Sequence, residues 1–243
     1  MPVISHKLKL AYFDIPKVAC TTLKTALWEI ENGREFEASP KLPISDRIRN
    51  LISDAKAENW LDIHDIDGYR TLSYRLAKEI DIPSDYDRIT VLRDPIARFY
   101  SAWSNKANWK TFSARGELYD LENEGLATSP SFPEFLREFE RYRAASRPVR
   151  VHTFPYAWHL GPDLSPYDKR FKLEKMGELE EYLSQRAGVQ VSLPKANRTV
   201  ASREPLDLSA PEIDKLIDLT KEEYAWLDGL YDQSASLERL LAR

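Results

Sequence analysis

The sequence is poor in the features that mark secreted, zinc-binding and membrane-spanning proteins. It has one cysteine, Cys20, which excludes an internal disulfide framework and a zinc site built from cysteines. No apolar run approaches the roughly 20 residues that cross a bilayer. Residues 1–10 lack the apolar segment and the small-residue cleavage site of a signal peptide. We therefore expect a cytoplasmic setting, and contact with the periphery of a membrane stays open.

A large excess of positive or negative charge is also missing. The 243 residues include 35 Lys and Arg against 39 Asp and Glu, a formal charge of −4, which argues against a general nucleic-acid binder. An anionic ligand must then be held by a local cluster of cations. The hydrophobic share of 42% indicates a globular chain rather than a disordered one. No repeat or linker divides it, so we expect a single domain over 1–243, with a helical tail over 209–243.

The order of the elements predicts an α/β fold. Apolar runs predict strands, and a 3.6-residue periodicity behind N-capping residues predicts helices. Alternation of the two is typical of a central, mostly parallel sheet flanked by helices. The predicted strands cover 7–14, 60–64, 88–92 and 171–173, and the predicted helices cover 21–31, a segment opened by Ser45, 69–80, 96–106, a segment from the capping box 131–134 to 142, 179–187, and the tail opened by the capping box 209–212.

Residues 15–24 (IPKVACTTLK) join the first predicted strand to the first helix. The first N–H groups of a helix have no intrahelical partner and carry the positive end of its dipole. Thr21 and Thr22 add hydroxyl donors, Lys17 adds a cation, and the two residues ahead of Thr21 are small enough for an anion to approach. These features predict a phosphate cradle. The segment lacks both glycines of a Walker A loop, and an ordinary strand-to-helix turn is the alternative.

Residues 89–103 form a second strand–turn–helix unit. Arg93 follows the predicted strand 88–92, at the edge where open α/β sheets bind ligands. Ser101 lies about two turns into the next helix, so Arg93 and Ser101 are predicted to clamp one phosphate from two sides. A guanidinium suits this task because its planar fork binds phosphate through two hydrogen bonds. The alternative is that Arg93 pairs with Asp94 or with a neighbouring helix and that Ser101 only faces a helix neighbour.

Together the two units resemble a known family. Residues 15–24 resemble the 5′-phosphosulfate-binding loop of the carbohydrate sulfotransferases, and residues 91–95 (VLRDP) with 101–103 (SAW) resemble their 3′-phosphate-binding motif. Residues 171–174 and 193–199 are similar to later segments of the Golgi-type members. Those members carry a membrane anchor and several cysteines, so the resemblance points to a soluble, bacterial-type relative.

The resemblance implies a P-loop-NTPase-like sulfotransferase fold. It also implies an enzyme that passes the sulfuryl group of 3′-phosphoadenosine 5′-phosphosulfate to a hydroxyl of a carbohydrate or glycolipid, with no metal required. Arg93 and Ser101 would hold the 3′-phosphate, and Arg198, with Lys195, would close over the nucleotide. Lys17 would neutralise charge on the bridging oxygen as its bond to sulfur breaks. The residues implied around the 5′-phosphosulfate are Lys17, Val18, Ala19, Cys20, Thr21 and Thr22.

Such a transfer needs a general base, commonly His or Glu, because a sugar hydroxyl is a poor nucleophile at neutral pH. His64 ranks first, because some family members carry a catalytic histidine between their two phosphate motifs and His64 lies in that interval. His152 and His159 are the alternatives, and each of the three could instead be structural. Glu174 could act as a base or pair with a nearby basic side chain.

Two rival functions stay open. The missing Walker A glycines and the lack of a convincing strand with Mg²⁺-binding carboxylates count against a P-loop nucleotide kinase. A non-catalytic module for nucleotides or glycans would keep the cradle and lack a base. Aromatic residues near the motifs could stack on sugar faces or belong to the core: Tyr100, Trp103, Trp109, Tyr156 and Trp158.

Overall fold

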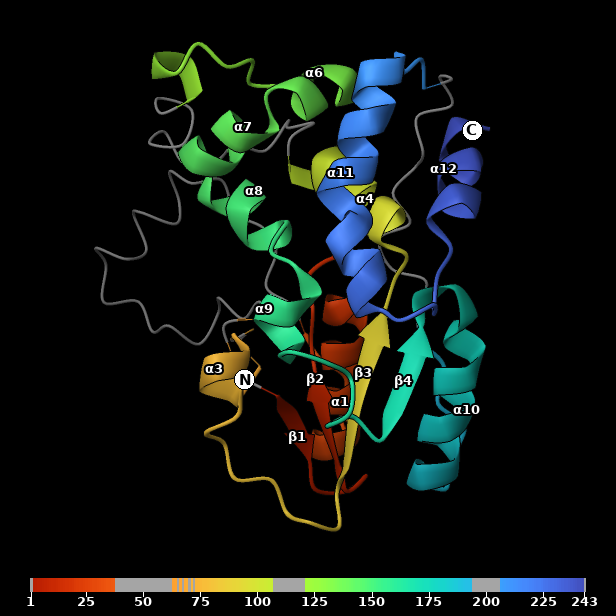
Figure 1. Ribbon diagram of the computed structural model, residues 1–243. Helices are drawn as coiled ribbons and strands as arrows, with labels where there is room; N and C mark the ends of the chain where they lie inside the picture. The colour runs from red at the N-terminus through yellow and green to blue at the C-terminus, as the bar shows by residue number, and fades with distance from the viewer. Residues whose placement is uncertain are drawn as a thin grey trace, which may run out of the picture.

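A single sheet organises the lower half of the molecule in Figure 1. The computed structural model describes residues 2–37, 63, 64, 66, 68, 69, 71, 73–106, 121–193 and 206–242, and within them the strand order is β1-β2-β3-β4. The pairs β2–β3 and β3–β4 are parallel, and β1 is antiparallel to β2, so the predicted mostly parallel sheet is confirmed. The strands are β1 (Val3–Ser5), β2 (Leu10–Phe13), β3 (Asp87–Leu92) and β4 (Lys169–Lys172).

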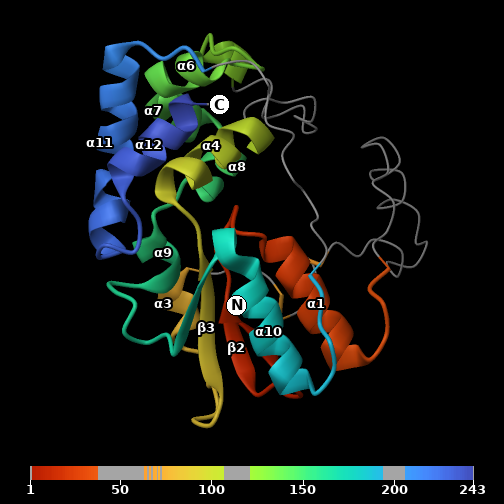
Figure 2. The same cartoon turned by 90° about the vertical axis from the view of Figure 1, so that its right-hand side faces the viewer.

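Helices cover both faces of this sheet. Figure 2 shows α1 and α10 on one face and α3 and α9 on the other. Strands covered on both faces are expected to be apolar throughout, and every residue of β2 is buried. Burial of a large apolar side chain contributes roughly 1.5–3 kcal/mol, so this packing fixes the strands and the turns that leave them. The helices are α1 (Cys20–Asn32), α3 (Tyr74–Ala77), α9 (Tyr156–Leu160) and α10 (Met176–Ala187).

A helical layer lies beyond the carboxyl ends of β3 and β4 (Figure 1). Its core is aromatic, since the ring of Phe99 lies 6.2 Å from that of Phe132, 5.7 Å from that of Phe135 and 5.0 Å from that of Phe139, between centroids. Such aromatic pairs add about 0.5–1.5 kcal/mol each to the effect of burial. The layer is α4 (Pro95–Lys106), α6 (Phe132–Arg137), α7 (Phe139–Ala145), α8 (Arg147–His152), α11 (Ala210–Trp226) and α12 (Gln233–Leu241).

Both predicted capping boxes form. Ser131 N donates to Oε2 of Glu134 at 2.7 Å, and Glu134 N donates to Oγ of Ser131 at 3.4 Å. Ser209 N donates to Oε2 of Glu212 at 2.8 Å. Each box fixes the start of a helix, because it occupies N–H groups that the helix itself cannot bond. The other confirmed predictions, with small shifts at their ends, are β3, β4, α1, α4 and α10.

The N-terminal strand differs from the prediction over 7–14. β2 begins later, because residues 6–9 form a turn in which Lys9 has a φ of 48° and donates its N–H to the carbonyl of His6 at 3.3 Å. This turn folds the chain back and lets β1, which was not predicted, pair with β2. The alternating polar and apolar residues before β2 therefore belong partly to a turn.

The strand predicted over 60–64 is wrong at Ile63 and His64, which lie in a turn. The rest of that segment lies outside the described residues, as does the helix predicted from Ser45. Ile63 is buried at 1% exposure, so its apolar character reflects packing of a turn against the core rather than a place in the sheet.

Two predicted helices are shorter than expected. The helix over 69–80 is reduced to α3, and the helix from 131 to 142 is interrupted at Glu138, whose φ of −102° and ψ of 16° leave the helical region. Its apolar stripe continues across the break because α6 and α7 pack on the same aromatic core. In the described part of the chain, no helix is both long and apolar enough to cross a membrane.

Candidate functional site

Two turns meet at one edge of the sheet. β2 and β3 are parallel neighbours in which Phe13 pairs with Thr90, so the segments that follow them leave from the same edge. The Thr90 hydroxyl donates to the carbonyl of Phe13 at 2.9 Å and joins the two strand ends. Just beyond, Nη1 of Arg93 donates to the carbonyl oxygen of Lys17 at 2.9 Å. The segments predicted to form the cradle and the clamp therefore lie side by side.

The β2–α1 turn, residues 14–19, has a backbone shape that suits an anion. Lys17 (φ 73°) and Ala19 (φ 62°) both occupy the left-handed region, which costs a non-glycine residue roughly 1–2 kcal/mol. Left-handed residues in such turns can gather successive N–H groups into an anion-binding concavity. Ala19 is the N-cap of α1 and has no side-chain oxygen for those N–H groups, and the first helical bond runs from Leu23 N to Ala19 O at 3.1 Å. The turn therefore presents the positive end of α1 without a cap of its own.

The side chains of this segment frame the backbone. Val18 and Thr22 are buried and anchor the turn to the core. Burial, and secondarily the carboxylate of Asp14, raise the pKa of the Cys20 thiol. Cys20 is thus a neutral thiol at neutral pH and adds no negative charge beside an incoming anion. The partly exposed members are Lys17, Ala19, Cys20 and Thr21.

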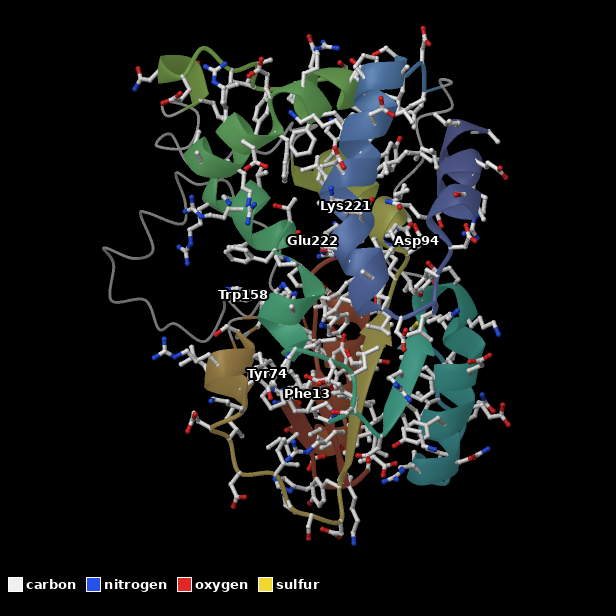
Figure 3. The ribbon with its side chains drawn as sticks, viewed as in Figure 1. Phe13, Tyr74, Asp94, Trp158, Lys221 and Glu222 are labelled. Carbon is white, nitrogen blue, oxygen red and sulfur yellow. The ribbon has the colours of Figure 1, made fainter. Side chains whose placement is uncertain are left out.

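The β3–α4 turn, residues 93 and 94, is built in the opposite way. Oδ1 of Asp94 accepts a hydrogen bond from Ala97 N at 2.9 Å and caps α4. Its Oδ2 accepts from the Tyr224 hydroxyl at 2.9 Å and from the Ser236 hydroxyl. Figure 3 shows Asp94 at this junction between α4 and α11. The positive end of α4 is therefore satisfied by a carboxylate of the chain itself.

Arg93 is fixed by Tyr156 through two hydrogen bonds. The Tyr156 hydroxyl donates to the Arg93 carbonyl at 2.6 Å and accepts from the Arg93 N–H at 3.2 Å. Tyr156 is fully buried, and this burial raises the pKa of its phenol, so it stays neutral. Ser101 lies on α4, as predicted, and is 4% exposed. That Arg93 and Ser101 clamp one phosphate stays a prediction.

A buried ion pair beside the β2–α1 turn was not predicted. Nζ of Lys24 lies 2.7 Å from Oδ2 of Asp14, and the two side chains are 0% and 2% exposed. Nζ also lies 3.2 Å from Oγ1 of Thr71 and 3.2 Å from Nδ1 of His64. Nε2 of His64 in turn lies 3.0 Å from Oγ1 of Thr21. The available signal was that Lys24 follows Thr21 by three positions, which places both on one face of α1.

The structure separates the candidate bases. His64 is joined to the β2–α1 turn through Thr21. Nδ1 of His152, on α8, donates to the carbonyl of Pro148 at 2.7 Å. His159 is 2% exposed, and burial together with the charge of Arg98 lowers its pKa to about 3. A group this weakly basic fits a structural role at neutral pH better than proton abstraction.

Glu174 lies at the same edge of the sheet, in the short 3₁₀ helix η2 (Leu173–Lys175) after β4. Its Oε1 accepts a hydrogen bond from Asp94 N at 3.3 Å, and its Oε2 accepts from the Tyr231 hydroxyl at 2.8 Å. These contacts tie η2 to the β3–α4 turn and to the segment between α11 and α12. The partners of Glu174 are therefore a backbone N–H and a tyrosine hydroxyl, rather than the basic side chain that the sequence suggested.

Of the aromatic candidates in the described residues, Trp158 of α9 is the exposed one. It is 38% exposed and stacks on Phe154 with 4.4 Å between ring centroids, and Figure 3 shows it at the outer side of α9. Tyr100, Trp103 and Tyr156 are buried core residues. The predicted residues that lie outside the described part of the chain are Trp109, Lys195 and Arg198.

Comparison with known proteins gives one match. A family model described as "Sulfotransferase family" matches residues 2–224, which include both turns and the residues linked through Lys24 and His64: Asp14, Thr21, Lys24, His64 and Thr71. No curated protein and no solved structure matches the chain.

Proposed function

The chain belongs to the sulfotransferase family, and from this premise we propose that it transfers the sulfuryl group of 3′-phosphoadenosine 5′-phosphosulfate to a hydroxyl of a carbohydrate or glycolipid. The match over residues 2–224 supports sulfotransferase activity in general, while the donor and the acceptor are our proposal. The observation that carries it is the 2.9 Å hydrogen bond from Arg93 to the Lys17 carbonyl. This bond joins the two turns that we assign to the two ends of the donor.

The donor carries negative charge at both its 5′ and its 3′ positions, so it needs two cationic sites on one edge. We propose that the N–H groups at the start of α1, together with Lys17, hold the 5′-phosphosulfate, because an uncapped helix N-terminus favours an anion. Arg93, with Ser101, holds the 3′-phosphate, since a guanidinium can bind two of its oxygens at once. Neighbouring parallel strands set the spacing between the two sites.

In the transfer, the acceptor oxygen forms a bond to sulfur while the bond from sulfur to the bridging oxygen of the 5′-phosphate breaks. Charge grows on the bridging oxygen, which leaves as part of adenosine 3′,5′-bisphosphate. Lys17 and the N–H groups of α1 stabilise this charge, and a preorganised contact of this type is worth about 2–4 kcal/mol in the transition state. Because these groups supply the positive charge, the proposed reaction needs no metal.

The hydroxyl proton must pass to a base, and we retain His64 and His152 as candidates. For His152, the hydrogen bond from Nδ1 to the Pro148 carbonyl means that the neutral ring carries its lone pair on Nε2, the form that a base requires. For His64, both ring nitrogens lie within hydrogen-bond distance of neighbours, Thr21 and Lys24. A pH profile of kcat/KM that loses its acidic limb in only one of His64→Ala and His152→Ala identifies the base.

Trp158 supports a saccharide as acceptor, because an exposed indole can cover the apolar face of a sugar ring. We expect Trp158→Ala to raise KM for a saccharide acceptor about threefold to tenfold, the effect of losing one stacking contact. The dissociation constant of adenosine 3′,5′-bisphosphate should not change. Val189→Ala, at a 65% exposed apolar side chain after α10, is the matched control and should change neither value.

Transfer of radiolabelled sulfate from the donor to a panel of saccharides and glycolipids tests the proposal directly. Binding of adenosine 3′,5′-bisphosphate in the presence of EDTA, with weaker binding of ATP, is expected as well. Preference for Mg²⁺-ATP would favour a nucleotide kinase. Tight binding of adenosine 3′,5′-bisphosphate without transfer to any acceptor would favour a binding module.

A further inference from the structure

The hydrogen bonds of Lys24 define the protonation of His64. An ammonium group has three N–H donors and no acceptor. Among the described residues, Nζ of Lys24 has three partners in reach, Oδ2 of Asp14 at 2.7 Å, Oγ1 of Thr71 at 3.2 Å and Nδ1 of His64 at 3.2 Å. The Thr71 hydroxyl in turn donates to Asp14. Because Lys24 can only donate, Nδ1 of His64 is an acceptor and carries no proton.

The other nitrogen of the ring then carries the proton. A neutral imidazole has one N–H and one lone pair, so Nε2–H of His64 donates to Oγ1 of Thr21 across 3.0 Å. The Thr21 hydroxyl is an acceptor in this bond, and its own proton is directed to another group. Thr21 is partly exposed and lies in the first turn of α1.

We propose that His64 is a positioning residue that orients the Thr21 hydroxyl as a hydrogen-bond donor to the 5′-phosphosulfate. The series Asp14, Lys24, His64 and Thr21 transmits this orientation from a buried charge to the anion site. The role rests on the proposed function, since it needs a donor anion at the start of α1. It gives His64 a role other than the base, and proton abstraction then belongs to another group, for which His152 is the retained candidate.

A purely structural role for the ion pair explains less. A buried pair such as Asp14–Lys24 is weak evidence for stability, because desolvation of the two charges offsets most of their attraction. The pair instead fixes the position of the proton on the His64 ring, at Nε2. Without the cation, either nitrogen of His64 could carry the proton, and the Thr21 hydroxyl could turn its proton towards the ring. With the cation in place, that proton is available to an anion.

The first test uses calorimetry with adenosine 3′,5′-bisphosphate, which binds without any chemical step. Thr21→Val removes the hydroxyl at nearly constant volume and should weaken binding about tenfold, the effect of a hydrogen bond to a charged group. Thr21→Ser should restore it. His64→Ala should weaken binding about threefold to tenfold, and His64→Gln, whose amide can donate to Thr21 but cannot serve as a base, should stay within about twofold of the wild type.

The double variant Thr21→Val/His64→Ala tests whether His64 acts through the Thr21 hydroxyl, which we call the relay, or whether the two residues contribute to binding independently. If His64 acts through the Thr21 hydroxyl, the double variant binds no more weakly than Thr21→Val alone. Losses that multiply would overturn the proposal. So would His64→Ala that binds as the wild type does while its sulfate transfer is lost, because a base affects the reaction and not the affinity.

A second measurement needs no variant. Nitrogen-15 NMR of the histidine rings should find the proton of His64 on Nε2, and a proton on Nδ1 would contradict the relay. Failure of the wild-type protein to bind adenosine 3′,5′-bisphosphate would overturn the proposed donor site and this role with it. Normal wild-type binding with an unaffected Thr21→Val variant would overturn the relay alone.

Discussion

The β2–α1 turn and the β3–α4 turn lie side by side, yet they treat the start of the following helix in opposite ways. α4 begins behind Asp94, whose carboxylate accepts from Ala97 N at 2.9 Å and occupies the positive end of the helix. α1 begins behind Ala19, which has a φ of 62° and no side chain that can cap. The start of α4 is therefore occupied by an anion of the chain itself, and we propose that the uncapped start of α1 receives one from a ligand.

The difference assigns separate tasks to the two turns. At the β3–α4 turn, the cap already occupies the helix start, so we propose that Arg93, whose backbone is held by Tyr156, is the group that binds the anion. At the β2–α1 turn, we propose that the backbone itself binds the anion, and the left-handed conformations of Lys17 and Ala19 are the cost of that shape. Strain of this kind is typical of ligand-binding segments.

The largest loss of affinity is expected when a carboxylate is introduced into the β2–α1 turn. Ala19→Asp would place a carboxylate beside the proposed 5′-phosphate site, where repulsion of roughly 3–4 kcal/mol between two nearby charges should weaken binding of adenosine 3′,5′-bisphosphate more than a hundredfold. Ala19→Gly is the control, since glycine accepts a φ of 62° at no cost, and its affinity should stay within about twofold. An unchanged affinity of Ala19→Asp, measured by calorimetry, would mean that the anion does not bind at this turn.

Removal of the cap from the β3–α4 turn should lower the free energy of unfolding of the protein. Asp94→Ala deprives α4 of its cap and leaves the Tyr224 hydroxyl without its acceptor, at a cost of about 2 kcal/mol in the free energy of unfolding. Asp94→Asn keeps the capping oxygen and should lose less than half of this. Urea denaturation measures both values. Equal stability of Asp94→Ala and the wild type would remove the contrast between the two turns.

Acid should destabilise the protein through His159 of α9. Burial and the charge of Arg98 lower the pKa of His159 to about 3 in the folded protein, against about 6.5 in an unfolded chain. Stability is complete above pH 6.5 and falls as the pH drops from 6.5 towards 3, because only the unfolded chain binds the proton. At pH 5.5 the loss is about 1.4 kcal/mol.

The variant His159→Phe removes this titration and keeps a ring in the aromatic surroundings of Phe154 and Trp158. The difference between its unfolding free energies at pH 7.5 and 5.5 should be about 1.4 kcal/mol smaller than in the wild type. Each protein serves as its own baseline, so any cost of the substitution itself cancels. An identical difference in both proteins would show that His159 titrates normally.

The sequence was sufficient for much of the fold because local signals define those elements. The β-branched run of β3, the Asp94-Pro95 start of α4 and the two capping boxes lie within a few residues of the structure that they specify. β1 was missed because a strand of three residues has too little pattern of its own, and it forms only through the turn at residues 6–9.

The sequence predicted that the two backbone turns of the candidate site would meet, and it did not predict the side-chain contacts around Lys24. Lys17 and Arg93 were brought together by a general property of parallel sheets, so their meeting could be anticipated. The contacts of Lys24 join residues that are 40 and 47 positions apart, and no local periodicity specifies such a contact. The hint in the sequence was the position of Lys24 three residues after Thr21, on the same face of α1.

The most direct test of the account is calorimetry of adenosine 3′,5′-bisphosphate with the wild type, Lys17→Ala and Arg93→Ala. One ligand is proposed to bridge both turns, since Arg93 already contacts the Lys17 carbonyl at 2.9 Å. Each substitution should then weaken binding at least tenfold, or about 1.4 kcal/mol. Wild-type affinity in both variants would contradict the shared site.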